Sequence, residues 1–264
     1  MIRRLWLLGC GTMAGAMLGR WLEIGTLNAA DVFVVNTADR LLPSGVAQGR
    51  SFPDGPLPDA VLLGVKPQQL SGVAAEHGAR LAGIGCLISI LAGVEEASLA
   101  QRFAAQGVVR AMPNLPVAIG AGVVALHASD VSASVRKGVA TLMAPLGLVE
   151  WVASTQFDLV TALAGSGPAF LYRFVDALGC AGAALGLPAD QAARLALGTV
   201  AGAASLAASA DARPADLADR VASPGGSTRC GLNVLDRDGA LERLLTQTLA
   251  AAAARNAELA AAAR

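Results

Sequence analysis

The sequence predicts an α/β protein in which a doubly wound, mostly parallel sheet is followed by an all-α domain. Short apolar runs alternate with helical patterns in the first half, as in a parallel sheet with crossover helices. A glycine turn directly follows the first apolar run, and from Phe157 onward no strand pattern is convincing. The 264 residues have room for two domains, which we place at residues 1–155 and 156–264.

Composition excludes several functional classes. Hydrophobic residues make up 54% of the chain and charged residues 15%, which excludes a disordered protein. The formal net charge is zero and no basic cluster occurs, so neither nucleic acid nor an anionic membrane is an expected partner. No stretch predicts a membrane span, and the apolar run Leu5–Leu8 is too short for an export signal. We therefore expect a cytoplasmic protein.

The cysteines lie far apart and form no CxxC pair. They are Cys10, Cys86, Cys180 and Cys230. This spacing predicts buried free thiols in a reducing compartment, with neither a disulfide framework nor a metal site.

The glycine turn has the form Gly9-x-Gly11-x-x-Ala14. It joins an apolar strand, Arg4–Leu8, to a helical pattern, and a second strand, VFVVN, begins after Asp31. This succession within about thirty residues is the context of the Rossmann dinucleotide-binding fingerprint. Gly9 permits the tight turn, Gly11 lets the backbone approach a pyrophosphate, and Ala14 allows close packing of helix and strand. The N-terminus of the helix faces the phosphates of the expected dinucleotide.

The end of the second strand bears on the choice of cofactor. NAD enzymes usually place an acidic residue there to bind the ribose 2′-hydroxyl, whereas this strand ends at Asn36-Thr37. Small neutral residues leave room for a 2′-phosphate, and Arg40 is near enough in the chain to reach it. The pattern favours NADPH over NADH, and a solvated loop charge is the alternative interpretation of Arg40.

Other apolar runs end in short turns that we expect to line the same site. These turns are Lys66-Pro67 after Ala60–Val65, Ala92-Gly93 after Cys86–Leu91, and Pro113-Asn114 after Val108–Ala111. Ligands of doubly wound sheets bind beyond the carboxyl ends of the strands. Each turn alone is ordinary, but together they predict the rim of a cofactor site that includes Asn114.

The second half predicts helices that are apolar over much of their circumference. They are Pro168–Leu185, Ala189–Ser209, Ala215–Val221 and Ala240–Ala263, the first with Ser166 as its N-terminal cap. One small domain cannot bury so much apolar surface, so a partner subunit is expected.

The segment SPGGST, residues 223–228, interrupts these helices. Pro224-Gly225-Gly226 presents unobstructed backbone N–H groups, and Ser227 and Thr228 add hydroxyls before a helix resumes toward Leu235. Backbone N–H groups at a helix N-terminus bind an anion without a cation. A plain turn between helices is the alternative interpretation.

Several motifs occur in one order: LLGCGTMA, GVKPQ, RAMPNLP, ALAGSGPAF and VASPGGSTRCGLNVL. Almost end to end, the chain resembles the pyrroline-5-carboxylate reductase family. The resemblance implies reduction of the C=N bond of L-1-pyrroline-5-carboxylate to L-proline, the last step of proline biosynthesis, with NADPH or NADH. It also implies a Rossmann domain joined to a helical domain that interlocks two subunits into a homodimer or a larger assembly.

The resemblance further implies which residues touch the ligands. Those expected at the cofactor, besides Arg40 and Asn114, are Leu8, Gly9, Cys10, Gly11, Thr12, Met13, Asn36, Thr37, Val65, Lys66, Pro67, Leu91, Ala92 and Gly93. Those expected at the substrate carboxylate are Ser223, Gly225, Gly226, Ser227 and Thr228. Thr228 would act as the catalytic residue by positioning the ring nitrogen. Asp211 stands where the family usually has a glutamate, and it would reach that nitrogen across the dimer.

Three alternatives stay open at this point. A β-hydroxyacid dehydrogenase relies on a lysine in its helical domain, but no lysine follows Lys137 and no histidine follows His127. A reductase of a related cyclic imine is harder to separate, because one methylene changes binding by only about 1–3 kcal/mol. The third is a non-catalytic regulator that binds NADPH on the same fold.

Overall fold

The computed structural model describes residues 2–262, and these divide into two compact units. The first holds the chain up to Ser166 together with the segment from Ala251 onward, and the second holds Gly167–Ala250. The division differs from the predicted boundary after residue 155 because α5 (Phe157–Val160) and a π-helical turn (Thr161–Gly165) belong to the first unit.

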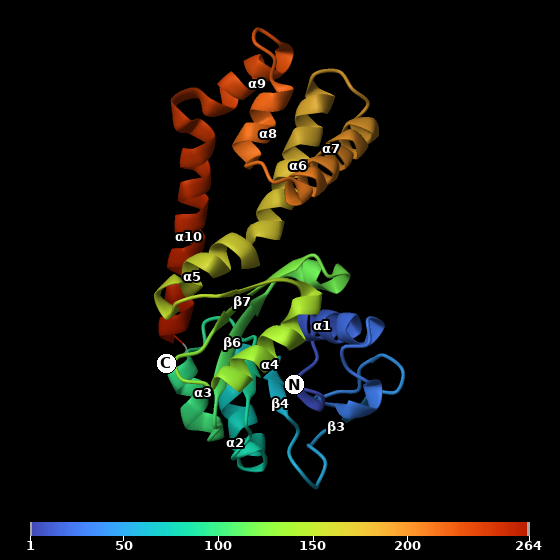
Figure 1. The fold of residues 1–264 in the computed structure, drawn as a ribbon, viewed down its shortest axis with the longest axis vertical. Helices are drawn as coiled ribbons and strands as arrows, with labels where there is room; N and C mark the ends of the chain where they lie inside the picture. Colours follow the sequence, from blue (N-terminus) through green and yellow to red (C-terminus); the bar gives the residue numbers. More distant parts are fainter. Residues whose placement is uncertain (1, 263–264) are drawn as a thin grey trace. The chain divides into compact units, whose positions relative to one another are not determined.

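The first unit is built on an eight-stranded sheet (Figure 1) with the order β3-β2-β1-β4-β5-β6-β7-β8. Its strands are β1 Leu5–Leu8, β2 Val32–Val35, β3 Ala47–Gly49, β4 Ala60–Leu63, β5 Leu87–Ser89, β6 Val108–Pro113, β7 Gly122–His127 and β8 Gly147–Trp151. All neighbours pair in parallel except β6 and β7, which are antiparallel. The chain crosses from β3 back past β2 and β1 to β4, so a crevice for ligands opens at the carboxyl ends of β1 and β4. The doubly wound, mostly parallel sheet is confirmed.

Helices cover both faces of this sheet, and the alternation of side chains along β1 explains how. Leu5 and Leu7 belong to one core cluster together with buried residues of α1 (Thr12–Glu23) and α4 (Ala133–Met143). Trp6 and Leu8 belong to the other, with residues of α2 (Leu70–Leu81) and α3 (Glu96–Phe103). A strand that is buried on both faces has a continuous apolar sequence, which is why the run LWLL predicted a strand.

The second unit is entirely helical. It contains α6 Gly167–Ala184, α7 Ala189–Ser209, α8 Pro214–Val221 and α9 Ser227–Asp236, and it shares α10 (Ala240–Ala262) with the first. The predicted helices are confirmed, except that Ala263, the predicted end of the last one, lies outside the described residues. The cap assigned to Ser166 is wrong. Its φ of −87° and ψ of −20° are helical, whereas a capping residue has extended geometry, because the π-helical turn leads directly into α6.

Large apolar side chains of α6 and α7 are exposed in the single chain. They include Leu171, Tyr172, Phe174, Leu178, Leu195 and Leu197. By length and composition α7 also qualifies as a membrane span. It has 21 residues and a mean hydropathy of 1.2, and 11% of its most apolar 18-residue stretch is buried. The sequence-based expectation that no stretch could span a membrane therefore does not hold for α7 by length and composition. The expected burial of all thiols is wrong for Cys180 and Cys230, which are exposed, and right for Cys10 and Cys86.

One cation is buried in the first unit, in the middle of β6. Arg110 is 8% exposed, and its guanidinium carbon lies 4.0 Å from the centre of the Phe157 ring. Burial lowers the pKa of Arg110, while the nearby carboxylates of Asp158, Glu95 and Glu96 oppose that shift. The side chain therefore ties α5 and α3 to the sheet by charge and by stacking.

Arg110→Ala is expected to lower the free energy of unfolding by about 2–3 kcal/mol, because it removes a buried charge from its carboxylates and opens a cavity. Arg136→Ala is the matched control, since Arg136 also stacks on an aromatic ring, Trp151, at 3.9 Å, but is only half-buried. We expect the control to cost less than about 1 kcal/mol in urea denaturation. Equal losses for the two variants would contradict the assignment.

Candidate cofactor and substrate sites

The glycine turn after β1 packs against β4 too closely for any side chain. Gly9 has φ of +86°, and its N–H donates to the carbonyl of Val35 at 2.8 Å. A Cβ on Gly9 would lie 2.8 Å from Cγ1 of Val65 and 2.9 Å from backbone atoms of Gly64 and Val65. A Cβ on Gly64 would in turn lie 2.6 Å from the Gly9 carbonyl oxygen and 3.0 Å from Cβ of Ala14. No sequence motif indicates Gly64, because a glycine is required there only when β1 and β4 pair.

The N-terminus of α1 opens beside this turn. Gly11 caps the helix with no side-chain hydrogen bond, and the first intrahelical bond runs from Gly15 N–H to the Gly11 carbonyl at 2.8 Å. The N–H groups of Thr12, Met13 and Ala14 therefore have no acceptor within the helix. A Cβ on Gly11 would meet nothing within 4 Å. The turn thus leaves free the space and the N–H donors that a pyrophosphate requires.

A cavity of about 500 Å³ lies at the ends of β1, β2 and β4. Of the residues predicted for the cofactor, it is lined by Leu8, Gly9, Cys10, Gly11, Asn36, Thr37, Arg40, Val65 and Lys66. It is also lined by Arg50, which follows β3, and by Gln69, Val73, Glu76 and His77. Gln69 caps α2 and the other three lie on it. Their spacing, i, i+4, i+7 and i+8, is that of one helical face, so helical periodicity was the signal available for them.

Asn36 holds the glycine turn rather than leaving its amide free for a ribose. The side chain is buried, and its Oδ1 accepts from the N–H of Cys10 at 2.9 Å. Its Nδ2 lies 3.5 Å from Oε1 of Gln48. Burial raises the pKa of the Cys10 thiol, an effect that Arg40 partly opposes. Cys10 therefore lines the cavity as a neutral thiol whose backbone donor is already used.

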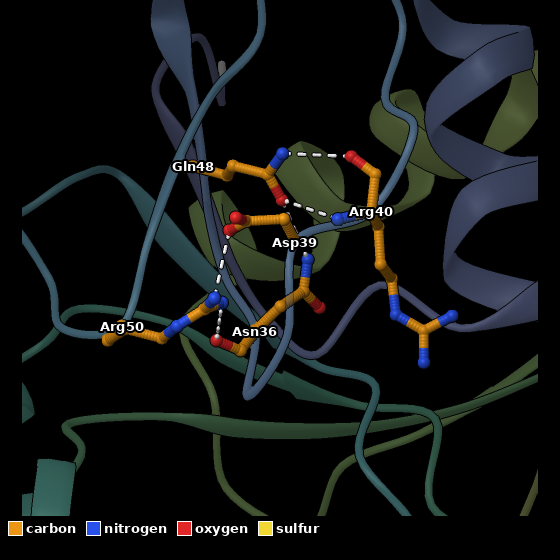
Figure 2. A network of polar contacts seen from close by, with 5 residues as sticks. All are labelled: Asn36, Asp39, Arg40, Gln48 and Arg50. Atoms are coloured by element: carbon orange, nitrogen blue, oxygen red, sulfur yellow. Dashed lines mark hydrogen bonds and ion pairs between the residues drawn. The ribbon is translucent and has the colours of Figure 1, made fainter.

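Three residues that line the cavity, Asn36, Arg40 and Arg50, belong to a polar network near the ends of β2 and β3 (Figure 2). Nη1 of Arg50 donates to the Asn36 carbonyl at 3.0 Å, and Nη2 lies 3.0 Å from Oδ1 of Asp39. Gln48 holds the backbone of Arg40 on both sides, accepting from its N–H at 3.2 Å and donating to its carbonyl at 2.8 Å. The Arg40 guanidinium points away from the other labelled residues (Figure 2). Within residues 2–262 it has no hydrogen-bond partner.

Other residues predicted for the cofactor lie outside this cavity. Thr12 lines a neighbouring hollow beside Arg40, and Met13, in the first turn of α1, packs against the core. Pro67 and Ala92 line a further cavity of about 530 Å³.

Near Ala92, Leu91 is buried, and Gly93 has φ of +71°. A Cβ on Gly93 would lie 3.2 Å from backbone atoms of Leu259 and Ala260 in α10. The turn therefore meets the end of α10, a contact that no motif indicated.

Asn114 has both ends of its side-chain amide in hydrogen bonds within the first unit. It is buried, its Oδ1 accepts from Val123 N–H at 2.8 Å, and its Nδ2 donates to the Ala164 carbonyl at 3.0 Å. Both polar ends of the amide are used to join the end of β6 to β7 and to the π-helical turn. The side chain does not line the cofactor cavity.

In the second unit, SPGGST forms a tight turn that opens α9. Gly226 N–H donates to the Ser223 carbonyl at 3.0 Å, and Gly225 has φ of +72°. Proline in second position and a positive φ in third are the signature of a type II turn. Gly226 caps α9 without a side-chain hydrogen bond, so the first N–H groups of the helix are free.

The hydroxyls beside that helix end are also free. Ser227 and Thr228 are exposed, and neither has a side-chain hydrogen bond within residues 2–262. Nη2 of Arg229 lies 2.5 Å from Oδ1 of Asp219, which joins α9 to α8. The predicted arrangement of exposed N–H and hydroxyl donors at a helix N-terminus is thus present, and its carboxylate ligand stays a prediction.

Asp211 is not part of this cradle within one chain. It lies in the connection between α7 and α8, whereas Ser223 follows the other end of α8. The eight residues of α8 separate the two by about 12 Å along the helix axis. The contact of Asp211 with the ring nitrogen across the dimer stays a prediction.

Comparisons with known proteins identify the family. A family model described as pyrroline-5-carboxylate reductase dimerisation matches residues 154–259. A Synechocystis pyrroline-5-carboxylate reductase is 34% identical, over 97% of this chain and 98% of its own. The Coxiella burnetii pyrroline-5-carboxylate reductase structure is 30% identical with a TM-score of 0.88, covering 98% of this chain and 99% of that one.

The fold is also that of Plasmodium falciparum pyrroline carboxylate reductase with NADP bound. Its TM-score is 0.83 at 23% identity, with 98% of each chain covered. Sequence, fold and site geometry agree, and the chain belongs to the pyrroline-5-carboxylate reductase family of oxidoreductases.

Proposed function

We propose that this protein reduces L-1-pyrroline-5-carboxylate to L-proline, the last step of proline biosynthesis, with NADPH preferred over NADH. The observation that carries the proposal is the open N-terminus of α9, where a type II turn and two free hydroxyls present donors to a small carboxylate. A site of this kind suits an amino-acid-like substrate, and family membership supports the same substrate.

The first unit holds the cofactor. The N–H groups at the start of α1 bind the pyrophosphate, and the absence of a Cβ on Gly11 lets it approach. Arg40 lies at the adenosine end, while Val65 and Lys66 line the cavity toward the nicotinamide half. The nicotinamide supplies the hydride when it is bound, and the protein supplies orientation.

The second unit holds the substrate and contributes no strong acid. No lysine or histidine occurs after Lys137, so a ketone would lack an obvious proton donor. A protonated imine is already electrophilic and needs only to be positioned. Thr228 directs its hydroxyl to the ring nitrogen, and Asp211 approaches it across the dimer.

The exposed faces of α6 and α7 support a homodimer. A contiguous apolar surface on a globular chain is typical of a subunit interface. The dimerisation family model spans both helices, which accounts for the apolar character of α7 without a membrane. We propose a cytoplasmic homodimer, or an assembly of such dimers, that binds neither membranes nor nucleic acid.

A turnover assay on the full chain tests the function. NADPH and NADH oxidation are followed with pyrroline-5-carboxylate, with its six-membered ring homologue, and with a β-hydroxyacid in the reverse direction. We expect the highest kcat/KM with the five-membered imine and NADPH. Tight NADPH binding without turnover would instead indicate a regulator, and preference for either other substrate would redirect the assignment.

Arg40→Gln is expected to raise the KM for NADPH roughly tenfold and to leave the KM for NADH unchanged, because only NADPH carries the phosphate that pairs with a guanidinium. Arg3→Gln is the control, since Arg3 is an exposed arginine at the opposite end of β1. Steady-state kinetics with both cofactors measure the effect. An equal change for NADPH and NADH would exclude a contact with the 2′-phosphate.

A further inference from the structure

A carboxylate paired with Arg50, a residue that lines the cofactor cavity, conflicts with a preference for NADPH. Asp39 follows β2 by a few residues, in the region where acidic side chains bind the 2′-hydroxyl of NAD. Its side chain is 83% exposed to solvent. A free carboxylate there would repel the phosphate that Arg40 attracts.

The structure pairs this carboxylate with a cation from the neighbouring strand. Arg50 directly follows β3, and β3 is held beside β2 by parallel pairing that continues into Asn36 N–H donating to the Gly49 carbonyl at 3.1 Å. The Arg50 guanidinium spans the gap, with Nη1 on the Asn36 carbonyl and Nη2 on Asp39, each at 3.0 Å. The bond to the backbone fixes the guanidinium, so its position does not depend on Asp39 alone.

A residue of β3, Gln48, also fixes the backbone of Arg40. Gln48 of β3 bonds the N–H and the carbonyl of Arg40, at 3.2 and 2.8 Å, and so holds its backbone in place. The Arg40 side chain then extends away from Asp39 and Arg50 (Figure 2). Two cations and one anion are thus divided into a neutral pair and a single free guanidinium.

We propose that Arg50 is a specificity-determining residue that acts through Asp39: it neutralises the carboxylate and leaves Arg40 to select the 2′-phosphate. This inference rests on the proposed use of NADPH. The pair is solvent-exposed, so we expect a change of roughly threefold to tenfold in affinity, reduced by added salt. Arg50 is a positioning residue and makes no contact with the phosphate itself.

The test is a double-mutant cycle in the full chain, read by ligand binding. The variants are Arg50→Gln, Asp39→Asn and both together, and the probes are adenosine 2′,5′-bisphosphate and adenosine 5′-monophosphate. Arg50→Gln is expected to weaken binding of the bisphosphate roughly fivefold and to leave the monophosphate within about twofold. Adding Asp39→Asn to Arg50→Gln should restore bisphosphate binding to within about twofold of the unmodified protein, because no carboxylate then needs neutralising.

The restored binding in the double variant distinguishes neutralisation of Asp39 by Arg50 from a direct contact between Arg50 and the phosphate. If the double variant binds the bisphosphate as weakly as Arg50→Gln, then Arg50 touches the phosphate directly and the inference is wrong. If Arg50→Gln leaves the ratio of the two affinities unchanged, the pair has no part in selection. Arg50→Lys keeps the charge and should retain most of the preference, which also covers the case in which Arg50→Gln fails to fold.

The fragments carry no nicotinamide and undergo no reaction, so the result does not depend on imine turnover. If the Arg50 and Asp39 substitutions act independently on bisphosphate binding while the protein still makes proline, only this inference is overturned. If Asp39→Asn restores the bisphosphate binding lost in Arg50→Gln but the protein does not reduce the imine, only the proposed function is overturned.

Discussion

Gly9→Ala is expected to lower the free energy of unfolding of the first unit by about 3 kcal/mol and to abolish measurable NADPH binding. The residue has φ of +86°, and its Cβ would approach Val65 and the backbone of Gly64 to within 2.8–2.9 Å. Backbone strain and overpacking each cost about 1–3 kcal/mol, and neither neighbour is a flexible side chain that can yield. Urea denaturation and NADPH titration measure the two effects.

Gly11→Ala is the matched control two residues away. Gly11 has an ordinary φ of −79°, and its Cβ would meet nothing within 4 Å. The free energy of unfolding should therefore stay within about 0.5 kcal/mol of the unmodified protein. NADPH affinity should still fall at least about tenfold, because the methyl group takes the space of the pyrophosphate. Equal losses of stability in the two variants would refute this account of the turn.

Thr228→Ala is expected to lower kcat/KM for pyrroline-5-carboxylate by roughly ten- to a hundredfold, the effect of losing one positioning hydrogen bond. The hydroxyl is exposed and unpartnered within the described chain, so thermal stability and NADPH affinity should not change. Thr228→Ser, which retains the hydroxyl, should recover most of the rate. An unchanged rate in Thr228→Ala would remove this residue from the catalytic assignment.

The elements predicted from sequence are those whose pattern is local. The pattern that predicts β1 lies entirely in its run LWLL, and the pattern that predicts α7 lies entirely within that helix. Both elements occur as expected. The strands β3 and β8 were missed because their residues are partly exposed and their extended form depends on pairing with β2 and β7. The helical turns before Ser166 were missed as part of the first unit because only tertiary packing assigns them to it.

The residues of the site likewise include some that a local motif predicts and others that only the tertiary fold brings together. The glycine fingerprint and SPGGST carry their chemistry in consecutive residues, so their geometry followed from the sequence. Gly64 and Arg50 have no motif, and they matter only because β4 and β3 bring them to the end of β1 and β2. Asn36 lines the cavity, and its side-chain oxygen accepts from the Cys10 N–H, a hydrogen bond that no sequence pattern specifies.

The most direct test of the central claim follows the hydride itself. The protein is incubated with pyrroline-5-carboxylate and NADPH deuterated at C4 of the nicotinamide on either face, and the product is analysed by NMR and mass spectrometry. The account predicts L-proline with one deuterium at C5 from one of the two labelled cofactors. NADPH consumption without labelled proline, or the absence of consumption despite tight NADPH binding, would contradict it.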